Sequence, residues 1–214
     1  MNSRNIMIAA EGYPFILTLV AISICFSLLG WFWIASLFYI GTIFVAWFFR
    51  NPERAAPYDE GIIVSPADGR ILKIEEVEEK SLLCGRFRKI SIFMNIFDVH
   101  VNRIPYSGRV EIIQYHKGRF LSADLDKASD LNEKNTILVR TKEGFGILII
   151  QIAGLIARRI VCWIRTGMDV HKGERFGLIR FGSRVEVILP IQSRITVKEG
   201  DRVKAGKTPI GWLR

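Results

Sequence analysis

Residues 12–49 contain no charged side chain, and this run of 38 positions constrains the chain more than any other feature. A helix needs about 20 apolar residues to cross the hydrocarbon core of a bilayer, so the run is long enough for nearly two crossings. A cleaved signal peptide has a basic start and an apolar region of about 7–15 residues, whereas this run is longer and its start is nearly neutral. The run therefore predicts a retained, helical membrane anchor over residues 1–50.

Gly30 divides this run into two apolar halves, residues 14–29 and 31–49. Each half is slightly short for a comfortable span, which leaves two interpretations: a tight helical hairpin, or one span followed by an interfacial helix. The second half is rich in aromatic residues, which favour the headgroup boundary. Arg50 and Arg54 follow, and the positive-inside tendency then places residues 51–214 on the cytoplasmic face of the inner (cell) membrane.

Residues 50–214 carry the whole formal charge of +9, because Arg4 and Glu11 are the only charged residues before them. This part is long enough for one globular domain. Its basic excess suits an anionic lipid surface, and a solvated basic surface without a partner explains the charge equally well. The three cysteines show neither a disulfide framework nor zinc spacing, which indicates a reducing compartment.

After Pro52 the sequence changes to short apolar runs separated by glycine, aspartate and charged residues. β-Branched and aromatic residues dominate these runs, as they do in strands. A polar loop is expected over residues 122–135, and residues 153–159 hold at most a short helical turn. The predicted fold class is mainly β (α+β at most), with strands at 61–64, 71–74, 90–97, 101–104, 108–113, and a hairpin of 136–141 with 145–152.

A weak internal echo relates residues 170–177 to residues 197–203. Each copy holds a glycine next to an acidic residue, between β-branched residues, which is typical of a tight turn. Two such turns predict a small β-sandwich or barrel in which similar hairpins stack. The pattern resembles the turns of biotinyl/lipoyl-like hammerhead folds, which concerns the fold and not the activity.

His100 is the histidine whose neighbours suggest chemistry, because Asp98 and Asn102 share its face if this segment is a strand. One interpretation is a half-exposed edge strand. The other is an acid/base group oriented by a neighbour, a role that suits histidine. No closely spaced histidine pair is present, so no zinc site is predicted.

Three other places have both a plain and a functional interpretation. Asp68 precedes Gly69, which is ordinary turn chemistry. Gly182 and Ser183 form a dipeptide common in turns and bulges, outside the nucleophile-elbow pattern. Arg158 and Arg159 suit a phosphate as a pair of donors, or a solvated face equally well.

Four motifs in order resemble the short form of the phosphatidylserine decarboxylase family. They are SPADG at residues 65–69, FDVHVNRIP at 97–105, IAGLIARRI at 152–160 and FGS at 181–183. Each motif alone is weak, and their common order makes the resemblance specific. It covers residues 50–214, and apolar N-terminal segments are also usual in that family.

The resemblance implies an enzyme that cuts its own chain between Gly182 and Ser183. Ser183 Oγ would attack the Gly182 carbonyl and turn the peptide bond into an ester. Elimination would release residues 1–182, and the dehydroalanine left at the start of residues 183–214 would hydrolyse to a pyruvoyl group. The implied catalytic residues are Ser183, Asp68 and His100.

The implied reaction is the decarboxylation of phosphatidylserine in an anionic membrane to phosphatidylethanolamine. The pyruvoyl ketone would form a Schiff base with the serine amine and accept the electrons freed as carbon dioxide leaves. Neither a metal nor pyridoxal phosphate would be needed. The two chains would stay associated, a homo-oligomer is compatible with the sequence, and no nucleic acid is expected as a partner.

One departure from the family pattern concerns the base for self-cleavage. Longer members carry Asp-x-His-x-x-His, and the second histidine position falls on Arg103 here. Arginine does not serve as a general base at ordinary pH. Either His100 doubles as the base, or another group such as Asp68 acts directly. Arg103 is then expected to stabilise charge or to face the substrate phosphate, and Arg158 and Arg159 are candidates to bind that phosphate.

Two alternatives stand beside this interpretation. The first is a membrane-tethered hammerhead carrier or scaffold without catalysis, although the Met-Lys-Met sequence of biotinyl carriers is absent. The second is a decarboxylase acting on a different serine-headed phospholipid, which these motifs do not exclude.

Overall fold

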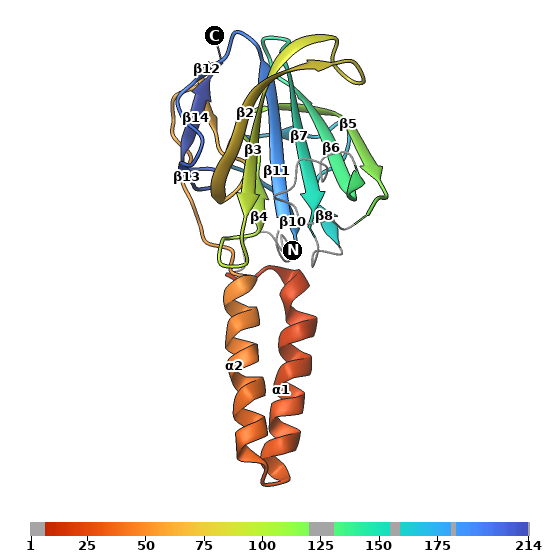
Figure 1. Ribbon diagram of the computed structural model, residues 1–214, viewed down its shortest axis with the longest axis vertical. Coiled ribbons are helices and arrows are strands. Elements are labelled where there is room, and N and C mark those ends of the chain that lie inside the picture. Colours follow the sequence, from red (N-terminus) through yellow and green to blue (C-terminus); the bar gives the residue numbers. More distant parts are fainter. Residues whose placement is uncertain (1–6, 120–130, 155–158, 181–182, 214) are drawn as a thin grey trace. The chain divides into compact units, whose positions relative to one another are not determined.

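The computed structural model describes residues 7–119, 131–154, 159–180 and 183–213, and divides into two compact units, Met1–Glu53 and Arg54–Arg214. The first unit is a helical hairpin of α1 (Tyr13–Leu28), preceded by a short 3-10 turn, and α2 (Phe32–Phe48). Figure 1 shows the two helices running antiparallel beside each other. Ala10–Leu28 is long and apolar enough to cross a membrane, and α2 is an apolar helix of slightly shorter length.

The hairpin is closed at both ends by backbone hydrogen bonds. At its tip Gly30 adopts a φ of 77°, which favours glycine, and Trp31 N–H donates to the Phe26 carbonyl at 2.9 Å. At its base Ala9 N–H donates to the Phe49 carbonyl at 2.8 Å. The structure therefore has the hairpin, the first of the two arrangements that the apolar run allowed.

The second unit is built from antiparallel strands in three sheets, within the described residues (Figure 1). The large sheet has eight strands in the order β13 (Arg202–Val203), β2 (Gly69–Glu79), β3 (Gly85–Met94), β11 (Ser183–Pro190), β7 (Gly146–Ala153), β6 (Lys134–Arg140), β5 (Gly108–His116) and β9 (Asp169–Val170). One small sheet has the order β1 (Ile62–Val64), β14 (Pro209–Trp212) and β12 (Arg194–Ile195). The other small sheet has the order β4 (Val101–Arg103), β10 (Arg175–Ile179) and β8 (Ile160–Cys162).

One face of the large sheet and the two small sheets enclose the main apolar core. Alternate residues of a strand share a face, so Ile90 and Ile92 of β3 and Val185 and Val187 of β11 all point into this core. Phe176 of β10 and Ile63 of β1 contribute from the small sheets. The mainly β fold, preceded by apolar helices, is confirmed.

The internal echo is confirmed at its turns but not in the strands around them. Gly173 and Gly200 adopt φ values of 82° and 92°. In each turn an acidic side chain accepts from a backbone N–H three residues earlier, Glu174 from His171 at 3.0 Å and Asp201 from Lys198 at 2.9 Å. The expected stacked hairpins are wrong, because each turn joins strands of different sheets: β9 to β10, and β12 to β13.

Other strand predictions hold with shifted bounds. The hairpin around residues 142–144 is β6 and β7, with Gly144 at a φ of 87°. The expected loop over 122–135 ends earlier, because Lys134 and Asn135 already belong to β6. The rest of this loop up to residue 130 lies outside the described residues, as do residues 155–158 of the possible helical turn.

Candidate active site

Ser183 is the first residue of β11, between two neighbouring strands at the centre of the large sheet. It pairs with Met94 of β3 on one side and with Ala153 of β7 on the other. It lies on the core-facing side of β11 with Val185 and Val187, and none of its surface is exposed. Its Oγ donates to Met94 Sδ at 3.5 Å. Ser183 is therefore held in a water-excluded place rather than in an open turn; Gly182 lies outside the described residues.

Asp68 is held by distant partners and not only by its own turn. Its two oxygens accept from both terminal nitrogens of Arg54, with Arg54 Nη2 at 2.8 Å from Oδ2. Oδ1 also accepts from the backbone N–H of Ala205 at 2.8 Å. The plain interpretation of Asp68 as local turn chemistry is therefore incomplete, because the carboxylate joins three segments of the chain.

Gly69, directly after Asp68, explains why an Asp-Gly pair stands here. Its φ is 149°, and a Cβ at this position would lie 2.0 Å from the Phe93 carbonyl oxygen. Only glycine allows β2 to approach β3 this closely beside the Asp68 carboxylate. The sequence SPADG thus serves a close approach between strands as well as a turn.

His100 and Asn102 are buried and Asp98 is partly buried, so the prediction of a half-exposed strand at His100 is wrong. His100 is 3% exposed and Asn102 is fully buried, although β4 is indeed an edge strand of its small sheet. His100 Nδ1 lies 3.0 Å from the Asp98 carbonyl oxygen, and its own carbonyl accepts from Ile179 N–H at 3.4 Å. The small sheet packs against the main core, so its edge does not face water.

Arg103, at the position of the missing second histidine, is 4% exposed and engaged with backbone. Its Nη1 donates to the Gly173 carbonyl at 2.8 Å. Its backbone N–H donates to the Pro66 carbonyl at 2.9 Å, which ties this segment to the one that carries Asp68. Two of the predicted motifs, SPADG and FDVHVNRIP, therefore meet in space.

The arginine pair is only partly described. Arg158 lies outside the described residues, whereas Arg159 is exposed and its carbonyl accepts from Arg180 N–H at 3.3 Å. Burial raises the pKa of Tyr115 to about 12; Glu133 adds to the shift and Arg159 opposes it. The positive charge of Arg159 therefore acts to lower the pKa of Tyr115, a residue of β5, against the larger effect of burial.

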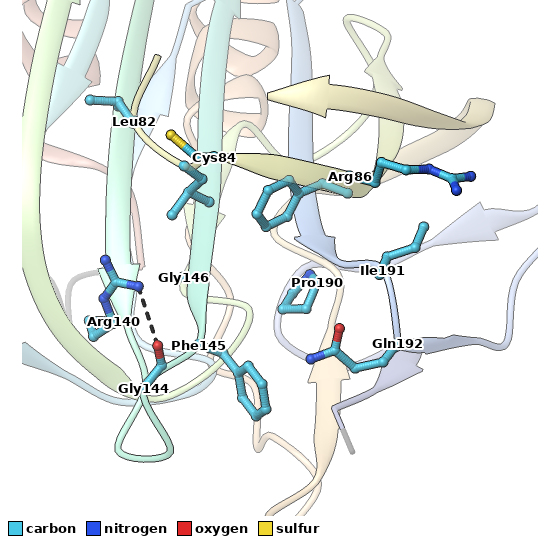
Figure 2. Close-up of a pocket in the computed structure, with 12 residues that line it drawn as sticks. Leu82, Cys84, Arg86, Arg140, Gly144, Phe145, Gly146, Pro190, Ile191 and Gln192 are labelled. Carbon is cyan, nitrogen blue, oxygen red and sulfur yellow. Dashed lines mark hydrogen bonds between the residues drawn. The ribbon is translucent and has the colours of Figure 1, made fainter. Parts of the chain in front are cut away.

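A pocket at the other end of the sheet is separate from these residues. Its volume is about 390 Å³, and it lies between the β2–β3 loop, the β6–β7 turn and the end of β11. Figure 2 shows Cys84 and Arg140 at its rim, with Arg140 donating to the Gly144 carbonyl. None of the predicted site residues lines this pocket. Within the described residues no group of three or more His, Cys, Asp and Glu side chains is arranged to hold a metal ion.

Sequence reasoning missed the partners of the predicted residues. In the sequence Arg54 is a positive charge that follows the apolar run, whereas in the structure it pairs with Asp68. Met94 was one apolar residue among many, and it is the acceptor for Ser183. The sequence shows Asn102 as a polar residue next to a predicted strand, but only the fold shows that it is buried beside Met94.

Known proteins are similar to this chain over 95% to 100% of its length. The family model described as phosphatidylserine decarboxylase matches residues 42–211. The phosphatidylserine decarboxylase proenzyme of Syntrophus aciditrophicus is 56% identical over 95% of this chain and 96% of that protein. The proenzymes of Magnetococcus marinus and Geotalea uraniireducens are 44% and 45% identical, over 97% and 100% of this chain and 96% and 100% of theirs. The chain therefore belongs to the phosphatidylserine decarboxylase family and is a carboxy-lyase.

Proposed function

We propose that the chain decarboxylates phosphatidylserine to phosphatidylethanolamine after cutting itself between Gly182 and Ser183. The observation that carries the proposal is the position of Ser183, fully buried at the first residue of β11 and hydrogen-bonded to Met94. A hydroxyl shielded from water attacks its own chain without competition from hydrolysis. The relatives are named proenzymes, which agrees with a precursor that matures by cleavage.

The surroundings of Ser183 fit a pyruvoyl group made from this residue. The Met94 thioether and Ala153 are compatible with a methyl group in place of the serine side chain, and Asn102 Nδ2 on the same sulfur is a nearby donor for a carbonyl oxygen. The pyruvoyl group supplies an electron-accepting carbonyl when carbon dioxide leaves the substrate.

Asp68, His100 and the arginines have separate proposed tasks. The buried His100 is the proposed base for Ser183, because histidine takes up a proton near neutral pH and Arg103 does not. The proposed task of Asp68 is to join Arg54 to the Ala205 backbone, since its carboxylate accepts hydrogen bonds from both. Arg158 and Arg159 are the proposed contacts for the substrate phosphate, since guanidinium groups bind phosphate with paired donors. Arg103, which is buried and bonded to the Gly173 carbonyl, is the proposed charge-stabilising residue.

The two products of cleavage are proposed to remain together. Residues 183–214 contribute β11, which lies between β3 and β7 and pairs with both. They also contribute β13, which pairs with β2, and β14, which pairs with β1. The smaller chain is therefore held by strands of the larger one through backbone hydrogen bonds and the shared core.

Intact-mass analysis and electrophoresis of the purified protein test this function. Wild type should give two chains, the smaller about 3.5 kDa at ~110 Da per residue. Its mass should be one ammonia below that of the peptide from simple hydrolysis. Ser183→Ala should give one uncut chain without decarboxylase activity toward phosphatidylserine vesicles. A wild-type chain that stays intact and still decarboxylates would overturn the mechanism.

We further propose that the helical hairpin holds the protein in the inner membrane with residues 54–214 on the cytoplasmic face. The helices present apolar side chains outward, including Leu28 and Trp33 near the tip, which are 84% and 92% exposed. Hydroxyl groups within the hairpin donate to backbone carbonyls of their own helix, as Ser23 does to Leu19 at 2.7 Å and Thr42 to Phe38 at 2.9 Å. A lipid environment favours such internal satisfaction.

Thiol labelling in intact cells tests this topology. With Cys25 and Cys162 replaced by serine, an impermeant maleimide should reach the exposed Cys84 only after permeabilisation. A second variant, Met7→Cys with Cys84→Ser, should behave in the same way, because both ends of a hairpin lie on one side. Labelling of Met7→Cys in intact cells, with Cys84 protected, would indicate a single span instead.

A further inference from the structure

Ser183 stands in a row of side chains that crosses neighbouring strands on the core-facing side of the large sheet. It pairs with Ala153 of β7, and the register of β7 with β6 places Glu133, the residue before β6, opposite Ala153. Ala153 N–H donates to the Glu133 carbonyl at 2.9 Å. Residues directly opposite each other point to the same face, so Ser183, Ala153 and Glu133 share one side of the sheet. With neighbouring strands about 4.8 Å apart, the Cα atoms of Ser183 and Glu133 are separated by about 10 Å.

The Glu133 carboxylate is buried and only partly hydrogen-bonded. The residue is 8% exposed, and its Oε1 accepts no hydrogen bond from any group in the part of the chain that the structure describes. The Tyr115 hydroxyl of β5 is hydrogen-bonded to this carboxylate. Tyr115 lies opposite Asn135, so it is on the same side of the sheet and one diagonal position from Glu133. A buried carboxylate oxygen is costly without a donor, so Oε1 indicates a donor from outside the chain, either a water molecule or a ligand.

Burial increases and the sign of the charge changes between the surface and Ser183. Arg159 is exposed and acts electrostatically on Tyr115, which is 51% exposed. Tyr115 is bonded to the nearly buried Glu133, and Ser183 has no exposed surface. A positive group therefore lies outermost, and a negative group follows it toward the buried serine. A ligand that enters with its positive group first and keeps its negative group near the surface matches this order.

The headgroup of phosphatidylserine has such an order of charges. Its phosphate joins it to the lipid, and its ammonium group lies beyond the phosphate, on the carbon that loses carbon dioxide. An ammonium has three N–H donors and no acceptor, which suits a carboxylate oxygen that lacks a donor. The residue between Glu133 and Ser183 in the row is Ala153, whose methyl group takes up little of the space between them.

We propose that Glu133, held by Tyr115, binds the ammonium group of the phospholipid substrate and directs that nitrogen toward Ser183; the inference rests on the proposed decarboxylation and names how its headgroup is recognised. The interaction is one of binding: Glu133 accepts hydrogen bonds from the ammonium, and no covalent bond to Glu133 forms or breaks. It selects phospholipids with a primary amine over those with an uncharged or anionic headgroup, because only a cation offsets the buried carboxylate charge.

Steady-state kinetics of the matured protein in detergent micelles test the proposal first. Glu133→Gln keeps the shape and an acceptor for Tyr115 but removes the negative charge. Its KM for phosphatidylserine should rise by about 10- to 100-fold, the usual effect of one hydrogen bond to a charged group, with kcat changed less. Glu133→Asp keeps the charge on a shorter side chain, and its KM should lie between those of wild type and Glu133→Gln.

Equilibrium binding gives a readout that does not depend on turnover. Calorimetry with the matured protein compares two probes: short-chain phosphatidylethanolamine, which carries the ammonium, and its N-acetyl derivative, which does not. Glu133→Gln should bind the first lipid about 10- to 100-fold more weakly than wild type does, and the second with unchanged affinity. The difference between the two lipids isolates the ammonium, since the phosphate and the acyl chains are common to both.

A matched variant and a second assay separate this role from a structural one. Glu111→Gln is the control, because Glu111 lies on β5 like Tyr115 but nearer its other end, where its two oxygens accept from Arg140 at 3.1 and 3.0 Å. Its KM and both lipid affinities should equal those of wild type. Self-cleavage, followed by electrophoresis, should proceed at the wild-type rate in Glu133→Gln, because Glu133 acts on the substrate and not on the precursor.

The proposal is overturned if Glu133→Gln keeps the wild-type KM and affinity, which would leave a water molecule as the donor to Oε1. It is also overturned if Glu111→Gln is equally impaired, if both lipids bind more weakly by the same factor, or if self-cleavage of Glu133→Gln slows as much as its affinity falls. If Glu133→Gln does not fold, Glu133→Asp and Tyr115→Phe carry the test, and both should raise KM by a smaller factor. A wild-type chain that neither cuts itself nor decarboxylates phosphatidylserine would instead overturn the proposed function.

Discussion

The pair of Arg54 and Asp68 offers a sharp test of how a nearly buried ion pair stabilises residues 54–214. Their side chains are 11% and 10% exposed, and both carboxylate oxygens accept from the guanidinium. Replacing Arg54 by methionine keeps much of the side-chain volume and removes the charge. Asp68 would then keep only the Ala205 N–H, at 2.8 Å, among these partners.

The cost follows from leaving a carboxylate nearly buried without its counter-charge. Breaking such a pair costs about 3–5 kcal/mol. Because each side chain keeps about a tenth of its surface in water, the lower end applies, about 3 kcal/mol. For a unit the size of residues 54–214 this lowers Tm by about 6–12 °C.

The assay is thermal unfolding of the uncut Ser183→Ala chain in detergent, at one fixed scan rate. The variants are Arg54→Met, Asp68→Asn and the double variant. We expect the double variant to be more stable than Arg54→Met, because it no longer buries an unpaired charge. A loss below about 2 °C in Arg54→Met, or a double variant whose loss equals the sum of the two single losses, would refute the reasoning.

Two other predictions concern the backbone and the thiols. Gly69→Ala should lower Tm far more than Gly85→Ala, although both glycines have positive φ, at 149° and 131°. A Cβ added at Gly69 would lie 2.0 Å from the Phe93 carbonyl oxygen, whereas a Cβ added at Gly85 would have no neighbour nearer than 3.9 Å. Equal losses of Tm would contradict the close approach of β2 to β3 at Gly69. Burial raises the pKa of the Cys162 thiol, so in single-cysteine variants at pH 8 it should react with an aromatic disulfide reagent at least about tenfold more slowly than the exposed Cys84. The Cys162 rate should keep rising with pH above about 9, where more thiolate forms; equal rates at pH 8 would contradict the raised pKa.

The motifs predicted the family and the mainly β fold, because local patterns carry that information. SPADG and FGS are short and contiguous, and the apolar, β-branched runs that form β3, β6 and β7 are visible in the letters. The central strand β11 is not among the predicted strands. Asp68, by contrast, bonds to Ala205, which lies 137 positions away. No local pattern predicts such a contact, so the Asp-Gly turn was the natural but incomplete interpretation.

The same limit explains the errors in strand pairing and a missed contact between two buried amides. A glycine turn reverses the chain over four residues, but it does not choose the sheet that each flanking strand joins, so β9 and β10 separate. The side chains of Asn102 and Gln151, which are hydrogen-bonded to each other, come from different sheets, 49 positions apart. Their meeting depends on the packing of one sheet over the other, which periodicity within a single strand does not encode.

The central place of β11 has a consequence for how the protein persists after maturation. An uncut precursor folds as a single molecule, so the association of residues 183–214 with the rest of the chain does not depend on protein concentration. Once the chain is cut before Ser183, as proposed, an unfolding event frees a short segment whose return is bimolecular and depends on protein concentration. Because β11 pairs on both sides, this segment leaves only when the sheet itself opens. After maturation the persistence of the enzyme is therefore set by the rate at which the sheet opens and not by the free energy of unfolding, because each opening is close to irreversible.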